Sequence, residues 1–513
     1  MITSQFKQFL YSKTMDTALV AAAECAEVGA LVDEIYQSFL GNELNNNSGK
    51  TKATLKIVLL NLYSSSISDP ELFVRYSRDE NFYRSANRYV CNDISYQSLV
   101  TKVIPGLLRL NLVDDQLGFF DRETGKSFWS RMRSTKKLIQ LFDKFNLKPW
   151  MLEVNQEREI IRLKDTNKKF INYKDDPFTL EAREQLKHIN HHLEAAVIDL
   201  NLNDEGMDAL LKTLRNVDID DDEKHLSMFT NKHLYRIFSN TSFKLHGRFY
   251  GPWWQNIPRG YRDNIFINGM ATVELDYSSF HPKMIHDLAG IEMSDDPYLG
   301  IGDLDRTHGK SMFNMMINAV GKDDAASRKK AIGAYMKEFR DESMTKESAY
   351  AAIEAVLERH KPIQEKFFSG IGLKLMFYDS QIANNVMLRA INEYQTVVLP
   401  VHDSFICVQE LEVHLRQLMA EEYIKVMSQE AAPGIDMKPS DYYMTDLEKL
   451  YQAEYGAPDG IDVPEGPKQK QRREALELQA LGARRRFGIT IEDVFTVESL
   501  EQKHAPQEAD DVL

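Results

Sequence analysis

Two apolar, β-rich segments that each hold an aspartate constrain this chain most. The first, 273–278, reads Val-Glu-Leu-Asp-Tyr-Ser and predicts a buried strand that ends at Asp276. The second, 396–408, places a polar His-Asp-Ser sequence between two apolar runs, which predicts a hairpin with Asp403 at its tip. A carboxylate between apolar strands lacks solvation and needs a cation or a hydrogen-bond donor. We therefore expect the two acids to meet on one sheet.

Two carboxylates that share a sheet predict a metal centre. Asp276 and Asp403 could together hold a pair of Mg²⁺ ions, with waters and substrate phosphates as the other ligands and Mn²⁺ as an alternative ion. A single aspartate at a strand end is more often a cap or an ordinary surface residue. The metal hypothesis therefore depends on the two acids lying close to each other.

A polar stripe is predicted along a helix between these strands. Arg306, Lys310, Asn314 and Asn318 recur at four-residue spacing, so they share one helix face, while Met and Phe residues form the other face. Arginine as a fork donor and lysine as a point charge suit a triphosphate. The alternative is a solvated surface stripe.

Composition excludes several protein classes. The chain has 513 residues, of which 43% are hydrophobic, which is typical of a globular protein. Its net charge of −14 argues against a protein that coats nucleic acid non-specifically, although a basic channel can coexist with an acidic exterior. Three scattered cysteines, no secretory signal pattern and no apolar run near the roughly 18 residues of a membrane span favour a cytoplasmic protein without disulfides or zinc.

Five regions are predicted along the chain. Residues 1–80 have the pattern of a mainly helical N-terminal region. Residues 81–150 read as helix, short strand, Gly-containing turn and aromatic return strand, which is the order of a winged helix. Basic residues at its turn and exit could contact phosphates, although a small packing domain with a basic surface is equally compatible; they are Arg122, Lys126, Arg131, Arg133, Lys136 and Lys137.

The remaining regions differ in composition. Residues 151–234 are helix-rich and charged, and residues 235–450 contain the motifs described above. Residues 451–513 read as a Pro/Gly-rich linker, a basic helix and a polar, disordered tail. A solvated helix face is the favoured interpretation of the basic helix, with an accessory protein as a possible partner.

Together the motifs resemble the family A DNA polymerases and their relatives, the single-subunit, phage-type RNA polymerases. The resemblance covers roughly residues 235–425 and follows the order of the family's Gly-Arg segment, motif A, motif B, primer–template glutamine segment and motif C. These elements match 247–262, 275–278, 306–310, 378–383 and 401–403. The resemblance implies an α+β right-hand fold, with palm and fingers in 235–450 and a thumb-like region in 151–234.

The resemblance also implies roles for single residues. Asp276 and Asp403 would bind both metals, and Arg306 and Lys310 would grip the triphosphate, with Lys310 able to protonate the leaving pyrophosphate. The implied nucleotide-binding residues are Tyr277, His281, Asn314 and Asn318, and the implied primer–template residues are Arg248, Gln255, Arg262, Gln381 and His402. The implied partners are a template, a primer and nucleoside triphosphates, with no membrane.

Departures from the family pattern leave the product open. Motif B lacks the usual base-stacking aromatic residue, and His281 stands where the DNA polymerases have a glutamate that blocks the ribose hydroxyl. Ser404 after Asp403 matches the RNA polymerases instead. We expect DNA-dependent DNA synthesis by a compact polymerase of a phage, plasmid or other mobile element, with RNA synthesis or priming as the alternative. A non-catalytic, DNA-binding winged-helix protein with a degenerate palm is the third hypothesis.

Overall fold

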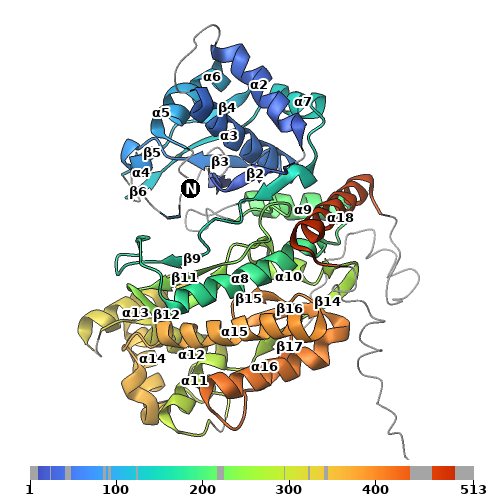
Figure 1. The fold of residues 1–513 in the computed structure, drawn as a ribbon. Coiled ribbons are helices and arrows are strands. Elements are labelled where there is room, and N and C mark those ends of the chain that lie inside the picture. The colour runs from blue at the N-terminus through green and yellow to red at the C-terminus, as the bar shows by residue number, and fades with distance from the viewer. Residues whose placement is uncertain are drawn as a thin grey trace, which may run out of the picture.

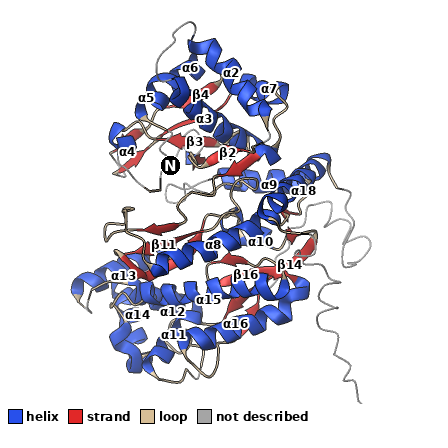
Figure 2. Ribbon diagram, in the orientation of Figure 1, coloured by secondary structure: helices blue, strands red, loops and turns tan. Residues whose placement is uncertain are grey.

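The computed structural model of the protein places helices and strands in two lobes (Figures 1 and 2). The mixed helix-and-strand composition agrees with the sequence analysis. Several segments at the termini and in loops lie outside the described residues. They include most of the predicted linker and tail, and Asp93, which the sequence suggests as a cap of the helix from Ser95 to Leu110. The structure describes residues 10–23, 25–40, 48–84, 88–89, 94–122, 125–216, 224–293, 295–321, 324–339, 345–438 and 465–490.

The N-terminal lobe is built on a four-stranded sheet in the order β1-β3-β7-β4. Helices α2 and α3 pack together beside it, and α3 contacts β3 and β7. The strands are β1 (Ser12–Thr14), β3 (Phe73–Tyr76), β4 (Val113–Gln116) and β7 (Ser130–Ser134), and the helices are α2 (Ala26–Leu40), α3 (Ser48–Ser68), α4 (Glu80–Arg84) and α7 (Lys136–Lys144). The helical character expected of residues 1–80 is present, but three short strands, β1, β2 (Leu19–Ala21) and β3, were missed.

The element order expected for 81–150 is present in this lobe. A helical segment runs through α5 (Tyr96–Ser98), the π-helical turn Leu99–Val103 and α6 (Ile104–Arg109), with Ser95 as its N-cap. β4 follows, then the hairpin of β5 (Phe119–Asp121) and β6 (Lys126–Phe128), then β7, which pairs back onto β4. Because β7 also pairs with β3, this unit shares its sheet with the preceding region.

Of the basic residues expected to face phosphates, Arg131 is buried in the lobe and Arg133 is engaged in ion pairs. Arg131 is only 1% exposed. The guanidinium of Arg133 pairs with Asp114 at 3.1 Å and with Glu71 at 2.5 Å. The expectation that Arg131 contacts phosphates is therefore wrong, whereas for Arg133, which is 23% exposed and already paired, it stays a prediction.

The larger lobe centres on a six-stranded sheet in the order β10-β13-β14-β16-β15, with β17 also paired to β14. A second sheet, β12-β11-β9, lies against helix α15, which also packs on α8 and α16. The first sheet comprises β10 (Ile198–Leu200), β13 (Ile265–Ile267), β14 (Met270–Tyr277), β15 (Leu399–Val401), β16 (Ser404–Val408) and β17 (Ile435–Met437); the second comprises β9 (Ile161–Leu163), β11 (Tyr235–Ser239) and β12 (Ser242–Tyr250).

Helices surround these sheets, as Figure 2 shows. They are α8 (Pro177–Ala195), α9 (Asp204–Arg215), α10 (Arg259–Arg262), α11 (Phe280–Ala289), α12 (Arg306–Asn318), α13 (Ala325–Glu338), α14 (Lys346–Arg359), α15 (Gly372–Tyr394), α16 (Glu412–Met427) and α18 (Pro467–Phe487). Each lobe has its own principal cluster of buried apolar side chains. None of the described helices is long and apolar enough to cross a membrane.

The basic helix α18 lies beside α8 where the two lobes meet (Figure 1). Leu476 on this helix is fully buried, and Arg472 bonds to Asp199 at 3.0 Å. The amide of Gln479 donates to the backbone oxygens of Leu152 and Phe229. The helix was predicted correctly, but its interpretation as a solvated face was wrong for these side chains, because its partners come from distant parts of the sequence.

Candidate active site

Strand β14 and the β15–β16 hairpin bring the two predicted aspartates together. Asp276 lies near the end of β14 and is paired in register with Ser404, the first residue of β16. Asp403 directly precedes Ser404, in the turn that joins β15 to β16. His402 in this turn has a φ of 59°, as tight hairpin turns require. The predicted hairpin with Asp403 at its tip is confirmed.

The Asp276 carboxylate lies in an environment that disfavours its charge. Burial, and then the nearby charge of Asp403, raise its pKa to about 6. Its Oδ1 is buried and has no hydrogen-bond partner among the described residues. The ammonium of Lys438, 3.6 Å from Oδ2, offsets only part of this cost. Asp276 is therefore a carboxylate that a bound cation would stabilise.

Glu274 lies two residues before Asp276 on the same face of β14, but its charge is satisfied. Arg262 donates to it at 2.9 Å and the hydroxyl of Ser404 at 2.5 Å, and Lys438 pairs with it at 2.5 Å. Burial by itself would raise the pKa of Glu274, but Lys438 and Arg262 outweigh burial and lower it. This network braces the strands beside Asp276, and it engages the Arg262 guanidinium that was expected to face a primer–template.

A second acid–base group lies next to the aspartates. Arg248 on β12 pairs with the buried Asp379 of α15 at 2.5 Å, and its Nη2 lies 3.3 Å from Nε2 of His281. Burial and then Arg248 lower the pKa of His281 to about 4, so the ring is neutral near pH 7. Its Nε2 then accepts from Arg248, which places the ring proton on Nδ1. The carboxylate of Asp403 also acts on Arg248 and Asp379 through its charge.

Helix α12 presents its cationic face on the same side as the carboxylates. Its apolar face is buried, while Arg306 and Lys310 are exposed, as the stripe predicted. Arg306 pairs with Asp296 at 2.7 Å, and Lys310 lies over the ring of Tyr298 at 5.9 Å from its centre. The positive charge of Lys310 offsets a small part of the rise in the pKa of Asp276, so the helix is near enough to act on this acid.

The two asparagines of the stripe interact within α12. The amide of Asn318 donates to the backbone oxygen of Asn314 at 2.8 Å, and Asn318 is exposed while Asn314 is half-buried. This bond closes the last turns of the helix on its polar face. The Oδ1 of Asn318 also packs closely against Gly372 of α15, where an added Cβ would lie 2.1 Å from it, so the Asn318 amide is engaged within the fold.

The predicted primer–template glutamines occupy different settings. The amide of Gln255 donates to the backbone oxygen of Pro400 at 2.9 Å and so supports the strand that leads into the hairpin. Gln381 lies on α15, and its Nε2 is buried without a hydrogen-bond partner among the described residues. His402 is exposed at the hairpin turn. Of the three side chains, His402 is open to a ligand, Gln381 has a buried amide nitrogen without a partner among the described residues, and the Gln255 amide is already engaged.

The prediction that Tyr277 binds a nucleotide is wrong. Its side chain is buried, its ring stacks on Phe280 at 4.2 Å, and its hydroxyl donates to the backbone oxygen of Met419. Successive side chains on a strand point to opposite faces, so Tyr277 points away from the face that carries Asp276.

Three residues of the site were missed as functional candidates: Glu274, Asp379 and Lys438. Glu274 and Asp379 are acids inside apolar stretches, which is a signal that could have been used. Nothing in the sequence around Lys438 indicates a functional role, because Lys438 reaches Asp276 only through the pairing of β17 with β14.

The two carboxylates fit a hard divalent ion. Their oxygens are the ligands that Mg²⁺ prefers, and the unpartnered Oδ1 of Asp276 provides an available lone pair. No group of three or more His, Cys, Asp or Glu side chains that could hold a metal occurs in the described part of the chain. An ion bound by Asp276 and Asp403 would therefore complete its coordination with water and phosphate oxygens, as Mg²⁺ commonly does.

Comparisons with known proteins give little beyond this geometry. No protein family model matches the chain, and no curated protein sequence is significantly similar to it. Among solved structures, the POL domain of Pol1 from M. smegmatis, in complex with DNA primer-template and dNTP, matches with a TM-score of 0.29 and 12% identity. The match covers 81% of this chain and 66% of that one. A TM-score of this size does not establish a shared fold.

Proposed function

We propose that this protein is a metal-dependent, template-directed nucleic-acid polymerase. The observation that supports the proposal most is that Asp276 on β14 lies beside Asp403 in the adjoining hairpin turn, with the Oδ1 of Asp276 buried and unpartnered among the described residues and its pKa raised. A cationic helix face beside two such acids provides partners for both a metal and a triphosphate. A site that joins nucleotides needs carboxylates to bind the metal and cationic side chains to bind the triphosphate.

In this proposal the larger lobe contains a palm and fingers. The sheet of β14, β15 and β16 forms the palm, helices α12 to α14 form the fingers, and residues 151–234 form a thumb-like region. The winged-helix-like unit of the N-terminal lobe would recruit the template. The support for this division is that α12 packs with α13 and α14 and that the charge of Lys310 on α12 acts on Asp276.

Different side chains have different roles in the proposed addition of a nucleotide. Mg²⁺, or Mn²⁺ in its place, would be held by Asp276 and Asp403 and would stabilise the attacking and leaving oxygens of an in-line displacement. Arg306 and Lys310 bind the triphosphate, and Lys310 gives a proton to the departing pyrophosphate. Arg248, held in place by Asp379, lines the primer–template duplex, and His402 positions the primer end.

The choice of sugar is proposed to depend on His281. Its ring is neutral and oriented by Arg248, so it presents a fixed, bulky group at the start of α11. Such a group would exclude a ribose hydroxyl, which favours DNA synthesis. One observation favours RNA synthesis instead: Ser404 bonds to Glu274, so the position after Asp403 supplies no further carboxylate to the metal.

Primer extension with Mg²⁺ or Mn²⁺ tests the proposal. Asp276→Asn and Asp403→Asn should each lower the rate about a thousandfold or more, because each removes several kcal/mol of charge stabilisation. Asp303→Asn, at an exposed position in the loop before α12, is the matched control and should keep the wild-type rate. Wild-type rates in both site variants would exclude this site.

The same assay decides the product. DNA and RNA templates, with deoxynucleotides or ribonucleotides and with or without a primer, separate a DNA polymerase from an RNA polymerase or primase. His281→Ala should raise ribonucleotide use if the ring excludes ribose. Tight binding of duplex DNA without incorporation on any template would favour the non-catalytic, degenerate-palm hypothesis.

A further inference from the structure

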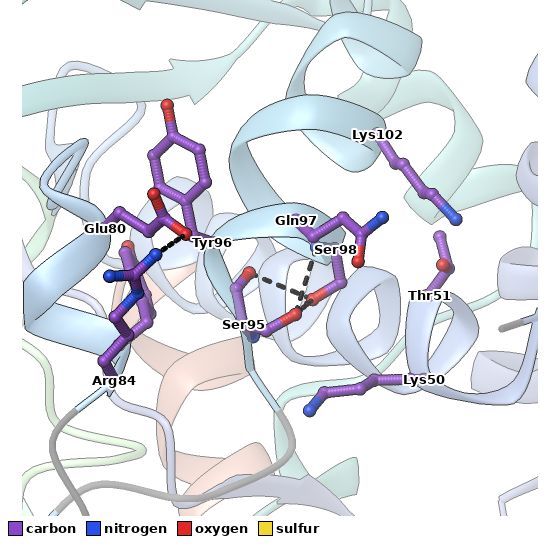
Figure 3. A pocket seen from close by; sticks show the side chains of 10 residues that line it. Lys50, Thr51, Glu80, Arg84, Ser95, Tyr96, Gln97, Ser98 and Lys102 are labelled. Carbon is purple, nitrogen blue, oxygen red and sulfur yellow. Dashed lines mark hydrogen bonds and ion pairs between the residues drawn. The ribbon is translucent and has the colours of Figure 1, made fainter.

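A polar pocket of about 350 Å³ lies in the N-terminal lobe, away from the aspartates (Figure 3). It is bounded by the first turn of α3, by α4 and by the start of the helical segment at Tyr96. The residues that line it are Lys50, Thr51, Glu80, Tyr83, Arg84, Ser95, Tyr96, Gln97, Ser98 and Lys102. Its size is in the range of ligand pockets, although its lining is unusually polar.

The charges of the pocket favour an anion. Its only carboxylate, Glu80, is paired with Arg84 at 2.8 Å. Lys50 and Lys102 have no ion-pair partner among the described residues, so the lining has an excess of positive charge in a chain whose net charge is −14. In Figure 3 the two lysines and Thr51 lie on one side of the turn formed by Ser95 and Ser98. Unpaired lysines beside hydroxyls are suited to phosphate oxygens.

A series of aromatic rings leads from this pocket to the lobe surface. Tyr96 lies 6.4 Å from Tyr83, Tyr83 lies 5.1 Å from Phe82, and Phe82 lies 5.2 Å from Trp129. Phe82 is 36% exposed and Trp129 is 39% exposed, which is unusual for rings of this size. Phe120, on the neighbouring β5–β6 hairpin, is 60% exposed. Exposed rings beside cations are the surface that stacks the bases of a single strand.

We propose that the pocket and this aromatic series together bind single-stranded nucleic acid. Lys50 and Lys102 hold phosphates, and the rings from Tyr96 to Trp129 stack on bases. A duplex is excluded as the ligand of the rings, because its bases are already stacked and paired. This site is separate from the aspartates, and it does not depend on the chemistry proposed for them.

Fluorescence anisotropy of labelled (dT)12 and (rU)12, measured on the full chain without divalent ions or triphosphates, tests this site. The double variant Lys50→Gln/Lys102→Gln should lower affinity about tenfold or more, and the slope of log K against log salt should shrink by about 1.4, since each lost contact on a single strand contributes about 0.7. The double variant Lys361→Gln/Lys425→Gln makes the same charge change at exposed positions outside the proposed fingers and should keep both values.

The rings are tested in the same way. Phe82→Ala/Trp129→Ala should lower affinity about tenfold or more with the salt slope unchanged, because stacking releases no counterions. Phe170→Ala, at a ring that is 39% exposed elsewhere, is the control. Affinities of both pocket and ring variants equal to those of their controls would overturn the proposal.

A local measurement guards against misfolded variants. In the wild-type protein, (dT)12 should protect Lys50 and Lys102 from acetylation, measured by mass spectrometry, and should leave Lys361 and Lys425 reactive. Equal reactivity of Lys50 and Lys102 with and without the strand would also overturn the proposal. Failure of primer extension leaves this measurement unaffected, so the two proposals fail separately.

Discussion

At the scale of single residues, the protein leaves the charge of Asp276 poorly satisfied. Between the ordinary aspartate pKa of 3.8 and the raised value of about 6, the folded state binds more protons than the unfolded state. The free energy of unfolding therefore falls as pH rises through this window, and the cost is fully present above about pH 6. A loss in the free energy of unfolding at a functional site is typical where a bound ligand, such as a cation, later neutralises the charge.

Asp276→Asn should therefore abolish activity and stabilise the fold. Without metal at pH 7, we expect the free energy of unfolding to rise by about 1–2 kcal/mol, a value discounted for the partial exposure of the carboxyl. The gain should vanish below pH 3.8, where the wild-type carboxyl is protonated in both states. Urea denaturation in a chelator measures it, with Asp303→Asn as the control. A variant less stable than wild type at pH 7 would contradict this account.

A second residue prediction concerns the ion pair of Arg248 and Asp379. Asp379 is 2% exposed, and burial raises its pKa to about 7. Above that pH, where the carboxyl is ionised, Asp379→Asn should leave the largely buried guanidinium of Arg248 without its carboxylate and lower the free energy of unfolding by about 3 kcal/mol. Arg248→Met should lower the free energy of unfolding by a similar amount. The loss in the double variant should be at least about 1 kcal/mol smaller than the sum of the losses in the two single variants. Strictly additive losses in urea denaturation would mean that the pair is not coupled.

At the scale of elements, the position of α12 depends on a close approach at Gly309. A Cβ there would lie 2.7 Å from the backbone oxygen of Tyr298, the residue whose ring lies near Arg306 and Lys310. The helix can approach this loop only because the residue has no side chain. The loop and the cationic stripe are thus fixed relative to each other by one glycine.

Gly309→Ala should displace α12 and lower the free energy of unfolding by about 1–3 kcal/mol. We also expect the KM for nucleotide to rise, because Arg306 and Lys310 move with the helix. Gly333→Ala on α13, where an added Cβ meets nothing within 4 Å, should instead stabilise by up to about 1 kcal/mol. Denaturation and incorporation kinetics on both variants measure these effects. Equal behaviour of the two alanines would show that the close approach at Gly309 has no energetic weight.

At the scale of the whole molecule, α18 lies where the two lobes meet, each of which has its own principal apolar core. Arg472 on this helix donates to Asp199 and to the backbone oxygens of Leu200 and Leu202, while Gln479 reaches Leu152. A helix near the end of the chain therefore closes contacts between segments that are distant in sequence.

Arg472→Ala should loosen α18 and lower the free energy of unfolding by about 3 kcal/mol, because Asp199 is left buried without its partner. The adjacent Arg473 pairs with Glu465 and Glu477 and is 40% exposed, so Arg473→Ala should change stability by less than about 0.5 kcal/mol. Trypsin cleavage within 467–487 should accelerate only in the first variant. Equal cleavage rates would contradict the structural role of Arg472.

The sequence by itself determined the local elements: the β14 strand, the hairpin that lifts Asp403, the polar stripe of α12, and the helix and hairpin of the N-terminal lobe. Each follows from side-chain periodicity and turn residues, which are properties of neighbours in sequence. Only the tertiary structure decided that Tyr277 points away from the site, that Arg133 and Arg472 are engaged, and that Lys438 and Asp379 lie beside the aspartates. These orientations and ion pairs depend on strand register and on packing between distant segments. The sequence shows that a residue is charged, but it does not show which residue will lie beside it.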